Sequence, residues 1–430
     1  MFSRNRNARG NVADLRSLPT LMAATAAALL LAASPALAEQ PNNEAFAATT
    51  AITLPHSQVV QSFDIGFVDA GLGLYLLADR TNNAIDAVET PNNFLFQLGA
   101  GQFAGAAASP DISGPNGVLT VGPNEIWVGD FNPANGGEVR VLDPFTNTIT
   151  QTIITGGTKR ADELCYDPND NLVLIANDAE PLPPSGTGPY VSFISTHGSN
   201  AYTVVGKITM DGTHGAPLAT NGIEQCQWSP KTGKFYLSIP EVNGPGNDTS
   251  AGAVLVISPQ TMKIVRTFTI PLGVCAGPQG MALGPENQIL LGCNNPNKTV
   301  PSTVVINARG GAVMHVLSNE DGSDEVWYNP GDGHYFLGRS GGAAASQQLG
   351  VVDAQSGRED VSPVTGAKPG GGAHSVAADP VSNQVYVPIG DNAGGNVCTA
   401  AGGSSAVGCI AVFTAPNDDK ARGHVFAQDH

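Results

Sequence analysis

The sequence has little charge and little that favours long helices. Only 13% of its 430 residues are Asp, Glu, Lys or Arg, whereas it contains 52 Gly and 31 Pro. Because Gly and Pro interrupt helices and mark turns, this composition argues against a helical protein. It favours many short strands joined by turns.

Long apolar runs are missing after the first forty residues, so we expect no membrane span in the mature chain. Near the start, four arginines precede the apolar run LMAATAAALLLAA, and SPALA then ends at Ala38 in a small-x-small pattern. These features are typical of a secretory signal peptide. Residues 1–38 are therefore predicted to be removed from an exported protein, periplasmic or extracellular, with an uncleaved anchor as the alternative.

Positive charge is also scarce. The chain has 20 Lys and Arg against 37 Asp and Glu, a formal net charge of -17 that becomes -20 without residues 1–38. Such an acidic chain should repel phosphate backbones, which makes nucleic acid an unexpected partner. The simpler interpretation of the acidity is that it keeps an exported protein soluble.

Motifs for nucleotides and zinc are absent. There is no Walker loop, GAGQFAG lacks the third glycine of the dinucleotide fingerprint, and no CxxC or Cys/His spacing of a zinc site occurs.

Six cysteines in an exported chain instead indicate disulfides. Cys398 and Cys409 bracket a short Gly- and Ala-rich loop and are predicted to pair. Elimination then gives Cys275–Cys293 and Cys165–Cys226, two pairings that are less constrained.

What the chain does contain is a repeat. GIEQCQWSPKTGKFYLSIP, which starts at Gly222, is echoed by SDEVWYNPGDGHYFLGRS about a hundred residues later. Seven segments share this pattern of a polar opening, an apolar run, a turn and an aromatic-rich run. They open at Asp64, Asn116, Asp162, Glu224, Gln279, Asp324 and His374. In five of them a proline lies six residues after the opening: Pro168, Pro230, Pro285, Pro330 and Pro380.

The mean spacing of these segments is about 52 residues, close to the length of propeller blades. Each unit continues into a third strand and a turn toward a fourth, which predicts an all-β, seven-bladed β-propeller with four-stranded antiparallel blades around a central channel. Residues 61–430 are predicted to form this single domain. Residues 39–60 are interpreted as an N-terminal lead-in, and one role for this segment is to close the ring of blades.

The units resemble the YVTN/NHL-type propeller repeats, and the unit that starts at Gly222 is similar to those of regucalcin-like gluconolactonases. Within that unit, CQW and KFYLSI are interpreted as strand residues, which leaves Glu224 and Gln225 as residues that no strand requires. The resemblance implies the fold more than the function, because propellers host hydrolases, lyases, binders and scaffolds. Gluconolactonases of this type hold a divalent metal with Glu, Asn and Asp side chains.

The seven opening residues, called the ring residues below, are all polar and are expected to lie near one mouth of the channel. Several carboxylates in one place repel each other unless a cation, protonation or water relieves the repulsion. Oxygen ligands suit Ca²⁺, Mg²⁺ or Mn²⁺. We therefore expect one divalent cation held among Asp162, Glu224, Asp324 and Asp64, with Asn294 as a neutral ligand. The alternative is a ring that binds water or neighbouring blades.

Other roles follow from side-chain chemistry. His374, the only histidine of the ring, and Glu224 are the candidate catalytic residues. Substrate-binding roles are predicted for Asp64, Asn116, Gln279, Glu325 and Arg339. Arg339 suits a substrate carboxylate, although neutralising Asp324, Glu325 or Asp391 is its simpler role. For His374, the simpler alternative to catalysis is that it only hydrogen-bonds within the ring.

Two functions are consistent with this sequence. The first is a divalent-metal-dependent hydrolase of lactone or ester type that acts on a small molecule at the central channel. The second is a non-catalytic propeller that binds a small molecule, a metal or a partner protein at its loop-rich rim.

Overall fold

Short strands joined by turns make up the fold. The computed structural model describes residues 46–294, 303–318, 320, 322–339, 347–360, 363–366, 374–391 and 397–415. They belong to a compact unit, Asn43–His430. The predicted signal peptide, residues 1–38, lies outside the described residues. Within the described part of the chain, no helix has the length and apolar character needed to span a membrane.

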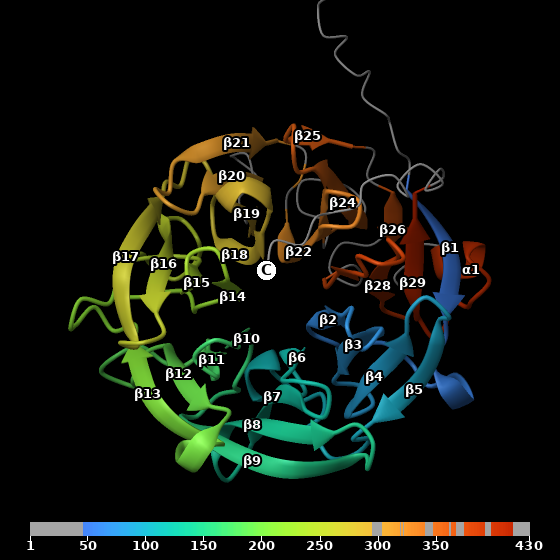
Figure 1. The fold of residues 1–430 in the computed structure, drawn as a ribbon, viewed down its shortest axis with the longest axis horizontal. Helices are drawn as coiled ribbons and strands as arrows, with labels where there is room; N and C mark the ends of the chain where they lie inside the picture. Colours follow the sequence, from blue (N-terminus) through green and yellow to red (C-terminus); the bar gives the residue numbers. More distant parts are fainter. Residues whose placement is uncertain are drawn as a thin grey trace, which may run out of the picture. The chain divides into compact units, whose positions relative to one another are not determined.

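Seven antiparallel sheets follow one another along the chain and form the blades of a β-propeller (Figure 1). The inner strands are β2 (Gly66–Asp69), β6 (Val118–Thr120), β10 (Leu164–Asp167), β14 (Cys226–Ser229), β18 (Pro278–Leu283), β22 (Ser323–Asn329) and β27 (Ala377–Ala378). The second strands are β3 (Leu74–Asp79), β7 (Ile126–Asn132), β11 (Leu172–Asn177), β15 (Lys234–Ile239), β19 (Gln288–Cys293), β23 (His334–Arg339) and β28 (Val385–Ile389).

The third strands are β4 (Ala84–Glu89), β8 (Gly136–Asp143), β12 (Tyr190–Ser195), β16 (Gly252–Ser258), β20 (Thr303–Asn307), β24 (Gln347–Asp353) and β29 (Cys409–Thr414). The outer strands are β5 (Phe94–Leu98), β9 (Thr148–Gly156), β13 (Thr203–Thr209), β17 (Lys263–Ile270), β21 (Val313–Leu317), β25 (Arg358–Glu359) and β1 (Ala47–Ile52). The predicted fold is therefore confirmed, with one addition: in the sixth blade a short strand, β26 (Val364–Gly366), also pairs with β24. The remaining elements are α1 (Val397–Ala400) and the 3₁₀ turns Pro55–Ser57, Pro110–Ile112, Gly198–Asn200 and Pro285–Asn287.

The first strand of the described chain belongs to the last blade. β1 pairs antiparallel with β29 from Ala47 opposite Thr414 to Ile52 opposite Ile410. The seventh sheet thus has the order β1, β29, β28, β27. Strands from both ends of the described sequence close the ring, so the blades cannot separate without breaking this ladder.

Tight turns between the first and second strands are built from the repeated Asp-Pro and related pairs. After β10, the Asp167 carboxylate accepts the N–H groups of Asn169 and Asp170 at 2.8 and 3.2 Å. Asn171 then adopts a left-handed conformation with φ 51°. An Asp side chain that accepts the backbone N–H two residues ahead favours a turn, which explains why Asp, Asn or Ser precedes four of the five turn prolines.

The core lies between neighbouring blades, because the middle strands of each sheet are buried on both faces. Phe193 of the third blade and Phe235 of the fourth, both fully buried, lie 6.4 Å apart between ring centroids. The three predicted disulfides, Cys398–Cys409, Cys275–Cys293 and Cys165–Cys226, are confirmed. The last of them joins the inner strands of two blades, β10 and β14.

Candidate functional site

The ring residues occupy equivalent places in their blades. In four blades the ring residue donates its backbone N–H to the carbonyl near the end of the second strand: Asp64 to Ala78, Asn116 to Gly129, Asp162 to Ala176 and Glu224 to Ser238. These bonds of 2.8 to 3.0 Å repeat because each first strand runs antiparallel to the second. The repeat therefore brings these polar side chains to the same edge of successive blades.

Contacts link four ring residues into one continuous group. Arg80 ion-pairs with Asp64 and donates from Nε and Nη2 to Asn116 Oδ1 at 3.0 and 2.7 Å. The His374 imidazole lies between two carboxylates, with Nε2 at 3.2 Å from Asp64 Oδ1 and Nδ1 at 3.1 Å from Asp324 Oδ2. Asp64, Asn116, Asp324 and His374 thus come together, as the prediction of one polar ring requires.

A second group forms around Arg160. Its Nε and Nη2 donate to Asp162 Oδ2 at 2.9 and 2.5 Å, and Nη2 also reaches Asp178 Oδ2 at 3.2 Å. All three side chains are largely buried. One cation that the chain itself supplies thus contacts both carboxyl groups, although burial outweighs Arg160 and raises the pKa of Asp162 and of Asp178.

Arg80 and Arg160 are functional-site residues that the sequence analysis missed. Arg80 directly follows Asp79 at the end of β3, and Arg160 precedes the ring residue Asp162 by two positions. In a chain with only 20 Lys and Arg, a basic residue this close to a ring position is a signal that could have found both.

The residues that follow the ring form a second polar layer, made of Glu163, Gln225, Glu325 and Ser375. Gln225 Nε2 donates to Glu325 Oε2 at 3.1 Å, and Gln225 Oε1 accepts the Met281 N–H. The Glu163 side chain also lies close enough to Glu325 to influence its pKa. Glu325, a predicted substrate-binding residue, is therefore held inside this buried layer.

Burial and mutual repulsion keep protons on these carboxyl groups. Burial and then Asp324 raise the pKa of Glu325 to about 8. Burial and the neighbouring Glu325 raise the pKa of Glu163 well above its usual range, and burial and Asp324 do the same to Glu224. Burial also acts to raise the pKa of Asp64, but Arg80 and His374 outweigh it and hold that pKa well below its usual range.

The remaining predicted residues lie elsewhere around the ring. Gln279 is half-buried in β18, and its carbonyl accepts the Ser238 hydroxyl. Arg339, at the end of β23, is buried and forms an ion pair with Glu320 at 3.4 Å. Asn294 donates to Asp248 Oδ2 at 2.9 Å.

Among the residues that the structure describes, no group of three His, Cys, Asp or Glu side chains is arranged to hold a metal ion. The contacts of Asp162 with Arg160, of Asp64 with Arg80 and His374, and of Asp324 with His374 supply positive charge without one. The divalent-cation site stays a prediction.

His374 gives a prediction on pH. Burial disfavours its charged form, but Asp324 and then Asp64 outweigh burial and raise its pKa from 6.5 to about 9. The stabilisation of the folded protein by the ion pairs of His374 is therefore complete below pH 6.5 and is lost as the pH rises through about 9. We expect His374→Gln to lower the unfolding free energy by up to about 1 kcal/mol at pH 6, because a partly exposed pair is screened, and by much less at pH 10. Denaturant unfolding of both proteins at the two pH values measures this, and equal losses would contradict it.

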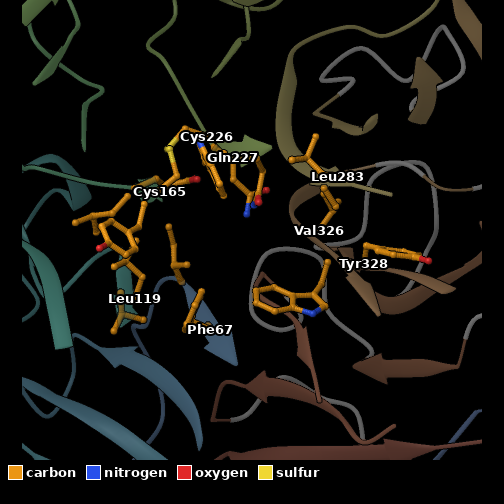
Figure 2. A pocket seen from close by; sticks show the side chains of 18 of the residues that line it. Phe67, Leu119, Cys165, Cys226, Gln227, Leu283, Val326 and Tyr328 are labelled. Atoms are coloured by element: carbon orange, nitrogen blue, oxygen red, sulfur yellow. A yellow bond between two sulfur atoms is a disulfide. The ribbon is translucent and has the colours of Figure 1, made fainter. Parts of the chain in front are cut away.

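A cavity of about 390 Å³ lies among the inner strands β2, β6, β10, β14, β18 and β22. Most of its lining is apolar or aromatic, and the Cys165–Cys226 disulfide forms part of one wall (Figure 2). Figure 2 shows side chains from several blades around one open space: Phe67, Leu119, Cys165, Gln227, Leu283, Val326 and Tyr328.

Two residues of the second layer, Glu163 and Gln225, line the cavity. Just ahead of β10, Asp162 belongs to the ring and Glu163 lines the cavity, and within β10 Leu164, Cys165 and Tyr166 continue its wall. Gln225 holds the same place ahead of β14. The central site therefore has a charged ring, a buried carboxyl and amide layer, and an apolar cavity in that order.

No protein-family model matches the chain, and no curated protein matches its sequence. Solved structures with the same fold include a chain of the mitotic checkpoint complex (11% identity, TM-score 0.54, covering 93% of this chain and 98% of that one). A chain of Kuenenia stuttgartiensis hydrazine synthase is similar at 12% identity and a TM-score of 0.55, covering 78% of this chain and 94% of that one. The Neurospora crassa Pan2 WD40 domain is similar at 11% identity and 0.55, with coverages of 87% and 97%. These likenesses support the propeller fold, and the regucalcin-like resemblance stays a prediction.

Proposed function

We propose that this chain is a binding propeller that holds a small molecule in the cavity among its inner strands. The observation that carries the proposal is the cavity itself, since small-molecule sites are concave, mostly apolar spaces of roughly 300 to 1000 Å³ with a few fixed polar groups. This cavity has about 390 Å³, and its carboxyl and amide groups come from Glu163, Gln225 and Gln227.

The polar end of the cavity is held in place before any ligand enters. Gln225 is fixed at both ends of its amide, by Glu325 and by the Met281 backbone, and Glu325 in turn contacts Glu163. The Cys165–Cys226 disulfide ties the two strands that carry Glu163 and Gln225. A site whose groups are already ordered loses less conformational freedom on binding, which favours affinity.

A neutral fluorescent probe, N-phenyl-1-naphthylamine, tests the cavity. We expect saturable binding at one site, and we expect Gln227→Trp to weaken it by at least about tenfold, because the half-buried Gln227 lines the cavity and an indole there fills it. Phe145→Trp is the matched control, since Phe145 is 78% exposed in the turn between β8 and β9. Probe emission measures both variants against the parent chain. Equal binding to all three proteins, or no saturable binding at all, would overturn the proposal.

The hydrolase interpretation stays a prediction beside this one. His374, whose side chain is 34% exposed, is the ring group placed to donate a proton, because the carboxylates on both sides keep it charged near neutral pH. Lactone or ester turnover that His374→Gln abolishes would favour it. The binding function is preferred because it requires only the cavity that the structure shows.

A further inference from the structure

Aromatic side chains dominate the part of the cavity farther from the ring. Its lining includes two of the three tryptophans in the chain, and all five aromatic members are partly exposed: Phe67, Tyr166, Trp228, Trp327 and Tyr328. Trp327 is oriented edge-on to Phe67, with centroids 5.7 Å apart and an interplanar angle of 81°. The faces of such rings carry partial negative charge and attract cations.

The ionisable side chain at the polar end of the cavity is a carboxyl group. Glu163 lines the cavity and is only 6% exposed, and none of the described residues that line it is Lys, Arg or His. The basic groups at the ring are Arg80, Arg160 and His374, and they are engaged by Asp64, Asp162, Asp178 and Asp324. A ligand in the cavity therefore meets acidic and aromatic groups together.

On the basis of the proposed binding function, we propose that the ligand is an organic cation, with an ammonium group at Glu163 and an apolar or aromatic body between the aromatic side chains. An ammonium N–H can donate to the Glu163 carboxylate, and ring faces favour the cation over a neutral group of the same size. A carboxylate or phosphate ligand would instead find no basic side chain among the described lining residues to pair with, and it would keep Glu163 protonated.

The titratable groups around Glu163 determine whether its carboxyl group is protonated when a cation binds. Glu163 faces Glu325, Asp162, Glu224 and Asp324, and Glu325 faces Asp324, His374, Glu163 and Asp64. Since Glu163 and Glu325 retain protons near neutral pH, a cation bound at Glu163 favours its ionisation, and the proton passes to solvent. Raising the pH ionises Glu325 near 8 and discharges His374 near 9, and both changes strengthen the attraction. Cation affinity should therefore rise between about pH 7 and pH 9.

Three naphthalene probes of equal body and different charge test this. Calorimetry should show 2-naphthylmethylammonium binding at least about tenfold more tightly than 2-naphthylmethanol, with 2-naphthoate weakest, since a hydrogen bond to a charged group contributes about 1.5 to 3 kcal/mol. Glu163→Gln should weaken the ammonium by about tenfold and leave the alcohol within about twofold. Gln227→Trp should weaken both.

The outcomes separate this inference from the function on which it rests. If the alcohol or the naphthoate binds as tightly as the ammonium, or if Glu163→Gln weakens alcohol and ammonium equally, the cation proposal is wrong while the binding function stands. Binding of N-phenyl-1-naphthylamine without any binding of the ammonium has the same meaning. If none of these probes binds the parent chain, the binding function fails as well.

Discussion

Replacing Arg160 by Met should lower the free energy of unfolding by about 3 kcal/mol. The Arg160 guanidinium lies between Asp162 and Asp178 at 2.5 and 3.2 Å, and all three side chains are largely buried. Removing one partner of a buried ion pair leaves charge without compensation, which costs about 3 to 5 kcal/mol. Met keeps much of the chain length of Arg, so the loss reports mainly the charge. Urea unfolding at pH 7 measures it.

The matched control for this variant is the preceding residue. Lys159 ion-pairs with Asp111 at 3.2 Å, but their side chains are 26% and 36% exposed. Lys159→Met should therefore cost at most about 1 kcal/mol. Adding Asp162→Asn to Arg160→Met should recover part of the loss, because it removes one of the two stranded carboxylates. Equal losses of unfolding free energy for Arg160→Met and Lys159→Met would contradict the interpretation that the chain's own arginines compensate the charge of the ring.

Removing the outer strand of the seventh blade should prevent folding or leave the protein marginal. A chain that starts at Leu54 lacks β1, which pairs with β29 over the whole length of both strands. It also lacks Phe46, a buried residue whose ring lies 5.2 Å from that of Phe336. Losing a buried Phe alone costs about 3 to 5 kcal/mol, a large share of the 5 to 15 kcal/mol that stabilises a typical protein.

The comparison chain starts at Asn43, so it keeps Phe46 and β1. We expect cooperative thermal unfolding of this chain by circular dichroism and no cooperative transition, or a strongly lowered one, for the chain that starts at Leu54. Coincident melting curves would show that β1 is dispensable and that the ring is closed by other contacts.

The fold was predictable because its signal is local and repeated. Seven polar openings, five prolines in register and the alternation of short apolar runs with turns specify seven sheets without knowledge of long-range contacts. Turn residues such as Asp167 and Pro168 act on their immediate neighbours. The ring residues were found for the same reason, since each lies at one fixed place in the repeat.

The ionic partners of the ring and the cavity were harder to predict. Arg80 and Arg160 lie outside the repeated positions, so their roles appear only when the strand ends are folded together. In the unit that starts at Gly222, CQW was interpreted as strand sequence, yet Cys226, Gln227 and Trp228 also line the cavity. A strand residue that lines the cavity has the same composition as one that packs in the core, because only the arrangement of blades decides which space it faces. Gln225, which no strand requires, does lie at the polar end of that cavity.

The central claim is that the cavity among the inner strands binds a small molecule, and a crystal soaked in a bromine-labelled ligand tests it most directly. With (6-bromo-2-naphthyl)methylamine, or with the neutral (6-bromo-2-naphthyl)methanol in a second crystal, each at millimolar concentration, the account predicts an anomalous bromine peak inside the cavity, beside Trp228, Trp327 and Tyr328. A peak only elsewhere on the protein, or no peak at all, with both ligands would contradict it.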